Sequence, residues 1–575
     1  MSRRTFTYVL AAVFAAGLAM RVAWLRADPP VADSVGIVWH DEGAWVHNAR
    51  NRALWGVWRT DAWNPVFVAP VFTALEYASF EAFGVGLWQA RVVPLVSGLA
   101  AIVALVIGLK AAAGREAAAI GAAILATTYA FVMWNRAALM ESTMTAAMVV
   151  AWAAYARGSR DARWGAIAGI AATGAWFTKA AAAFFIAALA LDASSAIIRG
   201  WRSDAPDRSA DARLAWWTLA GLAIAFAITG VAFVLPHWTD YRFYNWQMSV
   251  TRKPAYTLHA LVERASWLPV AEGILSRMWL VLVAAAIGLV GIVGRWRDAK
   301  PAERLLVLWV LIGFAELVIH DSSNERRYVM FIPALSALAA LLAARAWTSA
   351  PASTPASDRR ARVVFALIAL PLAYIVAGSL LRPLLVGDVD ANPYRTAVRL
   401  SAVIAVIWTT LQIWKPRMAA SLLSTAPARA RVAAMWLILV LSWNAFEYVR
   451  WTRHRSDVNY EASLALGRLL PAGTIVQGKL ANGLALDNCI RPLFVGNGFG
   501  NYDDRLRRDD ARYILTYDLP RIGYESSDGS GLIQGILDHY PRRRVVATFT
   551  VDETPDPDRA VLIDKMPSDE PHARD

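Results

Sequence analysis

Two adjacent acids, Asp41 and Glu42, are the residues of this chain whose type and position most directly suggest chemistry. They lie in the run Trp39–Trp45, just after the first apolar stretch of the sequence. Removing two carboxylates from water beside a membrane surface is costly, so such a pair lies either in bulk water or in a polar site. Because the surrounding sequence is hydrophobic almost throughout, the pair indicates chemistry at the mouth of a membrane cavity.

The composition predicts an α-helical polytopic membrane protein. Of 575 residues, 57% are hydrophobic and 18% are charged, and the mean hydropathy is +0.38; soluble domains carry about a quarter charged residues. Thirteen stretches reach, alone or with their flanks, the roughly 17–25 residues that a spanning helix needs. These predicted spans are 5–20, 92–109, 117–135, 142–156, 164–178, 180–198, 214–236, 278–294, 305–319, 328–344, 363–381, 400–414 and 432–446.

The distribution of basic residues predicts the orientation. With the N-terminus in the cytoplasm, the inside segments hold 23 Lys and Arg in 78 residues, against 17 in 141 on the other side. This excess agrees with the positive-inside rule. We therefore expect an integral protein of the cytoplasmic (plasma) membrane, with Asp41, Glu42 and the C-terminal tail exoplasmic. The pI near 9.9 follows from this topology and requires no nucleic acid.

Other charged residues lie at the predicted exoplasmic ends of spans. Arg136, Lys179 and the run Arg326-Arg327-Tyr328 could bind a phosphate group, although snorkelling to lipid headgroups is the alternative. Lys179 has no polar loop around it, which favours burial beside an anion. Glu141 begins a span, and an acid in the first turn of a helix is ordinary. The same alternative applies to Asp41 and Glu42.

Three histidines, His40, His47 and His237, could hold a divalent metal together with Glu141. Their spacing matches no defined site, so an interfacial role is favoured and a metal stays only a possibility. The single cysteine, Cys489, excludes an intrachain disulfide.

The chain divides into a membrane module, 1–450, with a long exoplasmic loop at 27–91, and a tail, 451–575. The tail alternates helical and strand patterns, which predicts a small exoplasmic α/β domain. Helices are expected at 461–470, 503–510 and 533–539, and strands at 474–477, 493–495, 513–516, 545–551 and 560–563. Glycines at 496, 498 and 500 indicate a turn rather than a nucleotide site, since no helix follows them directly.

Several motifs together resemble the GT-C glycosyltransferases, especially the protein O-mannosyltransferases and the bacterial aminoarabinose and related lipid-linked sugar transferases. The motifs are Trp39-His40-Asp41-Glu42, Asn48-Ala49-Arg50, Asn64-Pro65 with Pro70, Gln89–Pro94, Arg136–Glu141, Phe177-Thr178-Lys179, and Arg327-Tyr328 with Pro333. The chain departs from the family at Ala180-Ala181, where Gly-Pro is usual, and at Glu141, where Asp is commoner.

This resemblance implies an inverting transfer of a sugar from a polyprenyl-phosphate donor to an acceptor hydroxyl on a lipid, protein or polysaccharide. Such a reaction requires a base near the acceptor and cations near the departing phosphate. The resemblance implies that Asp41 is the base. Glu42 and Glu141 could position Asp41, the acceptor or a cation, while Arg136, Lys179, Arg326, Arg327 and Tyr328 are the candidates for binding the donor phosphate.

Two other functions remain open from the sequence. A transporter or lipid flippase would carry ionisable residues within its spans, often in repeated halves; here only Asp192 and Glu316 do so, and no repeat is evident. The chain could instead be a non-catalytic membrane scaffold that presents the tail, but this function would not explain the two acids of the first loop. The enzyme is therefore the favoured interpretation.

Overall fold

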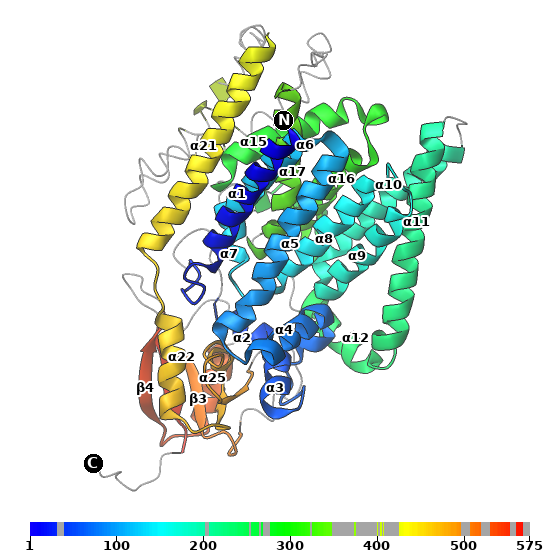
Figure 1. Ribbon diagram of the computed structural model, residues 1–575. Coiled ribbons are helices and arrows are strands. Elements are labelled where there is room, and N and C mark those ends of the chain that lie inside the picture. The colour runs from blue at the N-terminus through cyan, green and yellow to red at the C-terminus, as the bar shows by residue number, and fades with distance from the viewer. Residues whose placement is uncertain are drawn as a thin grey trace.

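The computed structural model describes residues 1–30, 39–201, 206–251, 255–263, 266–267, 277–322, 325–347, 373–374, 400, 403–404, 406–407, 425–495, 507–518, 530–551 and 559–566. Long helices form a bundle, and a small α/β domain lies at one end of it (Figure 1). We call this end the domain end of the bundle.

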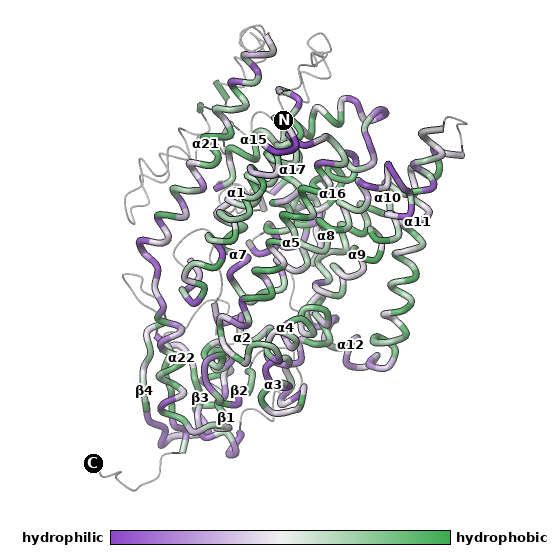
Figure 2. Tube along the Cα trace, in the orientation of Figure 1, coloured by the Kyte–Doolittle hydropathy of each residue, from purple (hydrophilic) through white to green (hydrophobic). Residues whose placement is uncertain are grey.

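The long helices supply the membrane part of the molecule. They are α1 (Arg3–Val22), α5 (Leu87–Ala113), α6 (Arg115–Thr127), α8 (Met140–Arg157), α9 (Trp164–Thr178), α10 (Ala183–Trp201), α11 (Pro206–Thr229), α15 (Trp279–Val293), α16 (Pro301–His320), α17 (Ile332–Trp347) and α21 (Ala426–Arg453). Apolar residues run along these helices and hydrophilic residues gather near their ends (Figure 2). Large apolar side chains such as Ile224 and Ile228 of α11 are exposed, as lipid-facing residues would be.

Six helical segments among the described residues are long and apolar enough to cross a membrane, and Trp279–Val293 is a shorter apolar helix. Most of the predicted spans 363–381 and 400–414 lies outside the described residues. The predicted number of 13 spans therefore stays a prediction, whereas the helical membrane architecture is confirmed.

Shorter helical elements connect the long ones. They are α2 (His40–Trp45), α3 (His47–Trp55), η1 (Pro65–Phe67), α4 (Pro70–Phe83), α7 (Tyr129–Trp134), η2 (Ala180–Ala182), η3 (Gly230–Val234), α12 (Trp238–Trp246), η4 (Gln247–Thr251), η5 (Leu258–Leu261), η6 (Trp296–Asp298) and η7 (Glu325–Phe331). In Figure 1, α2, α3, α4 and α12 lie at the domain end of the bundle. Pro70 begins α4, a position where a missing N–H costs nothing.

The C-terminal domain contains α22 (Val458–Leu469), β1 (Ile475–Gln477), α23 (Lys479–Gly483), β2 (Arg491–Leu493), β3 (Tyr513–Tyr517), α25 (Ser530–Asp538), β4 (Arg544–Thr550) and β5 (Arg559–Asp564). The strand order is β2-β1-β3-β5-β4. Strand β1 pairs in parallel with β2 and β3, whereas β5 is antiparallel to both β3 and β4.

Two apolar clusters cover the two faces of this sheet. Leu515 packs in a cluster with Leu466 of α22, and its neighbour Ile514 packs in another with Ile536 of α25. Successive strand residues point to opposite faces, so one short strand serves both clusters. The small α/β domain predicted from the tail is confirmed. The glycines at 496, 498 and 500 and most of the predicted helix 503–510 lie outside the described residues.

The C-terminal domain docks on the elements of the first long loop. Arg50 of α3 is buried and donates hydrogen bonds to the carbonyl oxygens of Ala485, Asn488 and Ile490 at 3.1, 2.9 and 3.0 Å. Burial lowers the pKa of Arg50 to about 10. The Asp61 carboxylate accepts from the backbone N–H of Phe494 at 2.7 Å. The first loop and the tail, which are far apart in sequence, therefore form one folded unit.

Candidate active site

Asp41 lies in the first turn of α2, at the junction of the bundle and the C-terminal domain. Its carboxylate is mostly buried and forms an ion pair with the guanidinium of Arg326, which comes from η7. The second oxygen, Oδ1, lies 3.6 Å from Nε2 of His40. Asp41 therefore lies between a guanidinium and an imidazole, and its carboxylate is a candidate proton acceptor.

Glu141 and Lys179 form a second ion pair. Nζ of Lys179 lies 2.5 Å from Oε1 of Glu141, which is buried in the first turn of α8. The other oxygen, Oε2, is buried without a hydrogen-bond partner. The Lys179 side chain is 21% exposed, and it lies where α9 ends and η2 begins.

These two pairs are electrically connected, because Arg326 interacts with both Asp41 and Glu141. The charges alternate along the series Lys179, Glu141, Arg326, Asp41, which we call the charge network. Four separate elements, η2 with α9, α8, η7 and α2, supply one member each. In this series each cation is balanced by a carboxylate, which reduces the cost of burying the charges.

Glu42, the neighbour of Asp41, is held in a different way. Arg91 of α5 donates to both of its carboxylate oxygens at 2.8 and 2.7 Å, and the N–H of Ala138 donates to Oε1 at 2.7 Å. Both charged side chains are almost fully buried. Bidentate charge-assisted bonds of this kind fix geometry strongly. Glu42 therefore anchors α2 to the bundle, and its oxygens are already occupied.

Three of the predicted phosphate-binding residues have other contacts. Arg136 donates to the carbonyl oxygens of Met20 and Arg21 at 3.1 Å and lies 4.6 Å from the ring of Trp451. Arg327 pairs with Glu316 at 2.6 Å, and the hydroxyl of Tyr328 donates to the Ser322 carbonyl at 2.6 Å. Of the five candidates for the donor phosphate, the structure thus places Lys179 and Arg326 in the charge network, whereas Arg136, Arg327 and Tyr328 have other partners. Packing explains the difference, since Arg136 caps the end of α1 instead of facing a cavity.

The three histidines each have a different set of partners. His47 bonds to Asp61 at 3.2 Å and to Asn482 at 3.0 Å. His237 bonds to the Phe233 carbonyl, and His40 lies between Asp41 and the C-terminal domain. Within the described part of the chain, no group of three or more His, Cys, Asp or Glu is arranged to hold a metal ion.

Two further charged residues of this region, Arg91 and Glu76, have no role that was predicted from the sequence. Glu76 of α4 is fully buried, and neither of its carboxylate oxygens has a hydrogen-bond partner. Burial and the nearby charge of Glu42 raise the pKa of Glu76 well above its ordinary value. The burial of Glu76 and its proximity to Glu42 thus favour the protonated form of this acid. Arg91 belongs to the motif Gln89–Pro94, which marked the segment but gave Arg91 no role, and Glu76, in the middle of α4, carries no sequence signal of its own.

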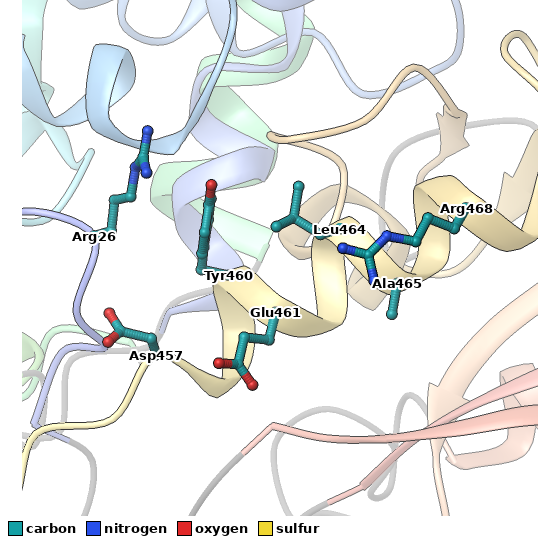
Figure 3. A pocket seen from close by; sticks show the side chains of 7 residues that line it. All are labelled: Arg26, Asp457, Tyr460, Glu461, Leu464, Ala465 and Arg468. Atoms are coloured by element: carbon teal, nitrogen blue, oxygen red, sulfur yellow. The ribbon is translucent and has the colours of Figure 1, made fainter.

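A groove of about 700 Å³ lies away from the charge network. Its walls are Arg26, just after α1, and one exposed side of α22 (Figure 3). Arg26 stacks on the ring of Tyr460 at 4.9 Å from its centroid. The groove contains none of the four network residues, so its size does not make it the active site.

The two acids within predicted spans are both paired. Asp192 accepts from Arg304 at 2.7 Å and from the hydroxyl of Tyr155 at 2.7 Å. Glu316 accepts from Arg327 at 2.6 Å. Paired intramembrane acids of this kind can hold helices together. The pairing of these two acids therefore requires no role in a transport path.

Comparisons with known proteins agree with this architecture. Residues 67–206 match the family described as dolichyl-phosphate-mannose-protein mannosyltransferase. The structure is similar to that of ArnT from Cupriavidus metallidurans in the apo state, with a TM-score of 0.54, 19% identity and coverage of 98% of this chain and 97% of that one. The same protein bound to undecaprenyl phosphate gives 0.52, 18%, and 98% of both chains. No curated protein sequence matches significantly.

Proposed function

Since the chain has the GT-C fold of membrane glycosyltransferases, we propose that it transfers a sugar from a polyprenyl-phosphate donor to an acceptor hydroxyl. The acceptor belongs to a lipid, a protein or a glycan on the exoplasmic side of the membrane, and transfer inverts the anomeric carbon. The observation that carries this proposal is the ion pair of Asp41 with Arg326, next to the pair of Glu141 with Lys179.

In the proposed reaction, Asp41 accepts the proton of the acceptor hydroxyl. The acceptor oxygen attacks the anomeric carbon while the bond from that carbon to the phosphate oxygen breaks, and the electron pair leaves with the polyprenyl phosphate. A positioned base contributes about 100- to 10,000-fold to such a step. Direct displacement on the face opposite the phosphate gives inversion.

Lys179 and Arg326 are the cations that would meet the donor phosphate. In the described structure both are neutralised by carboxylates, Glu141 and Asp41. A donor phosphate near Arg326 would compete with Asp41 for that guanidinium, which would leave the Asp41 oxygen available for the acceptor proton. Cations that stabilise the departing charge are the main electrostatic contribution to phosphate-leaving reactions. Glu141 keeps Lys179 oriented toward this region.

A transporter or flippase is the alternative. Against it, the two acids within the predicted spans are both paired in the described part of the chain, Asp192 with Arg304 and Glu316 with Arg327. The deciding experiment is an assay of the purified protein in lipid nanodiscs against a panel of polyprenyl-phosphate sugars. We expect one donor to release polyprenyl phosphate in an acceptor-dependent manner. If every donor stays intact with every acceptor class while labelled lipid crosses the bilayer, the transport function would replace the enzymatic one.

A further inference from the structure

His40 connects the candidate base to the C-terminal domain. Nδ1 of His40 lies 3.0 Å from the hydroxyl oxygen of Tyr517, the last residue of β3. On the other side of the ring, Nε2 lies 3.6 Å from Oδ1 of Asp41. His40 and Tyr517 are only 8% and 7% exposed. A residue of the sheet thus reaches Asp41 through one imidazole ring.

The backbone around His40 is held on the same domain. A Cβ on Gly43 of α2 would lie 1.8 Å from the carbonyl oxygen of Asn482, and a Cβ on Gly483 would lie 2.8 Å from Cα of His40. Helices α2 and α23 therefore touch backbone to backbone, which only glycine permits at these positions. Trp39, directly before α2, packs in the apolar cluster of the domain. The domain thus sets the position of α2.

The groups on either side of His40 favour one arrangement of proton donor and acceptor on its two nitrogens. A neutral imidazole has one N–H donor and one acceptor nitrogen, and the hydrogen bond at one nitrogen decides which carries the proton. Nε2 lies 3.6 Å from Oδ1 of Asp41, which is longer than a hydrogen bond, and the negative charge of this carboxylate favours the tautomer that carries its proton on Nε2. Nδ1 then has to accept, and the Tyr517 hydroxyl can supply the proton for that hydrogen bond.

We propose that Tyr517 is a positioning residue, which holds His40 with its proton on Nε2 and thereby orients the carboxylate of Asp41. This inference rests on the proposed function for its catalytic consequence, although the contact itself does not. In this proposal the C-terminal domain takes part in the reaction, because its residue Tyr517 holds the histidine that lies beside the candidate base. The site would then contain residues from both ends of the chain, His40 near the N-terminus and Tyr517 near the C-terminus.

The contact can be tested without any substrate. The chain has 8 histidines, so ¹⁵N-histidine labelling gives a small spectrum, and loss of one resonance in His40→Asn assigns His40. We expect an unprotonated Nδ1 and a protonated Nε2 in the unaltered protein, and a mixture of tautomers in Tyr517→Phe. Tyr513→Phe, which changes a tyrosine of the same strand that lies beside Arg512, should leave the His40 signals unchanged. A protonated Nδ1 in the unaltered protein, or unchanged signals in Tyr517→Phe, would overturn the inference.

Kinetics test the consequence for the reaction. Loss of a hydrogen bond that orients a functional histidine typically costs about 10- to 100-fold, so we expect Tyr517→Phe to lower kcat about 10-fold with little change in KM. In a His40→Asn background the same change should add nothing, because Tyr517 acts through His40. An equal loss in both backgrounds would make the role of Tyr517 merely structural and would refute the proposal. If the unaltered protein transfers no sugar, the proposed function fails, and the tautomer measurement still decides the Tyr517–His40 contact.

Discussion

Arg91 donates hydrogen bonds to both carboxylate oxygens of Glu42, from Nε at 2.8 Å to one and from Nη2 at 2.7 Å to the other. Only 2% and 3% of the two side chains is exposed. The bond links α5 of the bundle to α2, which carries Asp41 on the residue before Glu42. Two adjacent acids that look equivalent in the sequence thus have separate roles, one as an anchor and the other as a candidate base.

Glu42→Gln should destabilise the protein. It leaves the Arg91 guanidinium buried without its counter-charge, and removing one partner of a buried pair costs about 3–5 kcal/mol. The measurement is thermal unfolding in detergent. Asp240→Asn is the matched control, because it breaks an exposed ion pair with Arg59 at 3.0 Å, worth at most about 1 kcal/mol. Equal unfolding temperatures for both variants would show that Glu42 is no anchor.

Lys179→Gln should weaken use of the donor and raise its KM. Because this change leaves Glu141 buried and unpaired, it also lowers stability. The double variant Lys179→Gln/Glu141→Gln removes both charges and should recover most of that stability while the KM defect stays. Arg242→Gln, an exposed cation of the α12 region, serves as the control and should keep a normal KM. A normal KM in the double variant would remove Lys179 from the donor site.

Asp28 makes the docking of the C-terminal domain depend on pH. It accepts hydrogen bonds from Ser456 at 2.8 Å and from Asn459 at 3.0 Å, and burial raises its pKa from 3.8 to about 6. The folded state therefore binds the proton more tightly than the unfolded state does. Docking is most stable below pH 4 and weakens as the pH rises through about 6, and the loss amounts to roughly 3 kcal/mol.

Hydrogen exchange of the α22 amides at pH values from 4 to 7.5, corrected for intrinsic rates, measures this effect. Protection should fall with rising pH in the unaltered protein, and the slope should vanish in Asp28→Asn, which cannot ionise. Asp457→Asn changes an exposed acid nearby and should retain the slope. A slope that persists in Asp28→Asn would assign the pH effect to another group.

Gly43→Ala should separate α2 from α23. The new methyl group would lie 1.8 Å from the Asn482 carbonyl oxygen, so one of the two backbones has to move. We expect a loss of roughly 1–3 kcal/mol, the usual range for overpacking, together with faster hydrogen exchange in α23. Gly174→Ala on α9 has no atom within 4 Å of the added carbon and should be neutral or slightly stabilising. Unchanged exchange in Gly43→Ala would contradict the backbone contact.

Local patterns in the sequence predicted much of the architecture. Apolar stretches gave the helical membrane fold, and alternation in the tail gave α22, β1, β3 and β5 within one or a few residues of their bounds. These features depend on periodicity over a few residues, which the sequence carries directly. The position of Glu141 at the start of a helix was also predicted, because an apolar stretch begins directly after it.

The partners of the charged residues could not be predicted in this way. Arg326 and Arg327 are neighbours, yet one pairs with Asp41 and the other with Glu316. The choice depends on the direction of each side chain in η7, which is set by packing against distant helices. For His40 the sequence favoured an interfacial role over a metal site. Its contact with Tyr517 could not be predicted, because it joins two residues that are far apart in the chain.

Sugar transfer by the Asp41→Asn variant tests most directly whether Asp41 is the base. The amide keeps the shape of the side chain but cannot accept a proton near neutral pH, where an ordinary Asp is ionised. We predict a fall in transfer of at least about 100-fold, with unchanged membrane insertion, while Asp240→Asn stays near normal. Transfer close to normal in Asp41→Asn, together with an inactive Glu42→Gln or Glu141→Gln, would contradict the assignment of Asp41 as the base.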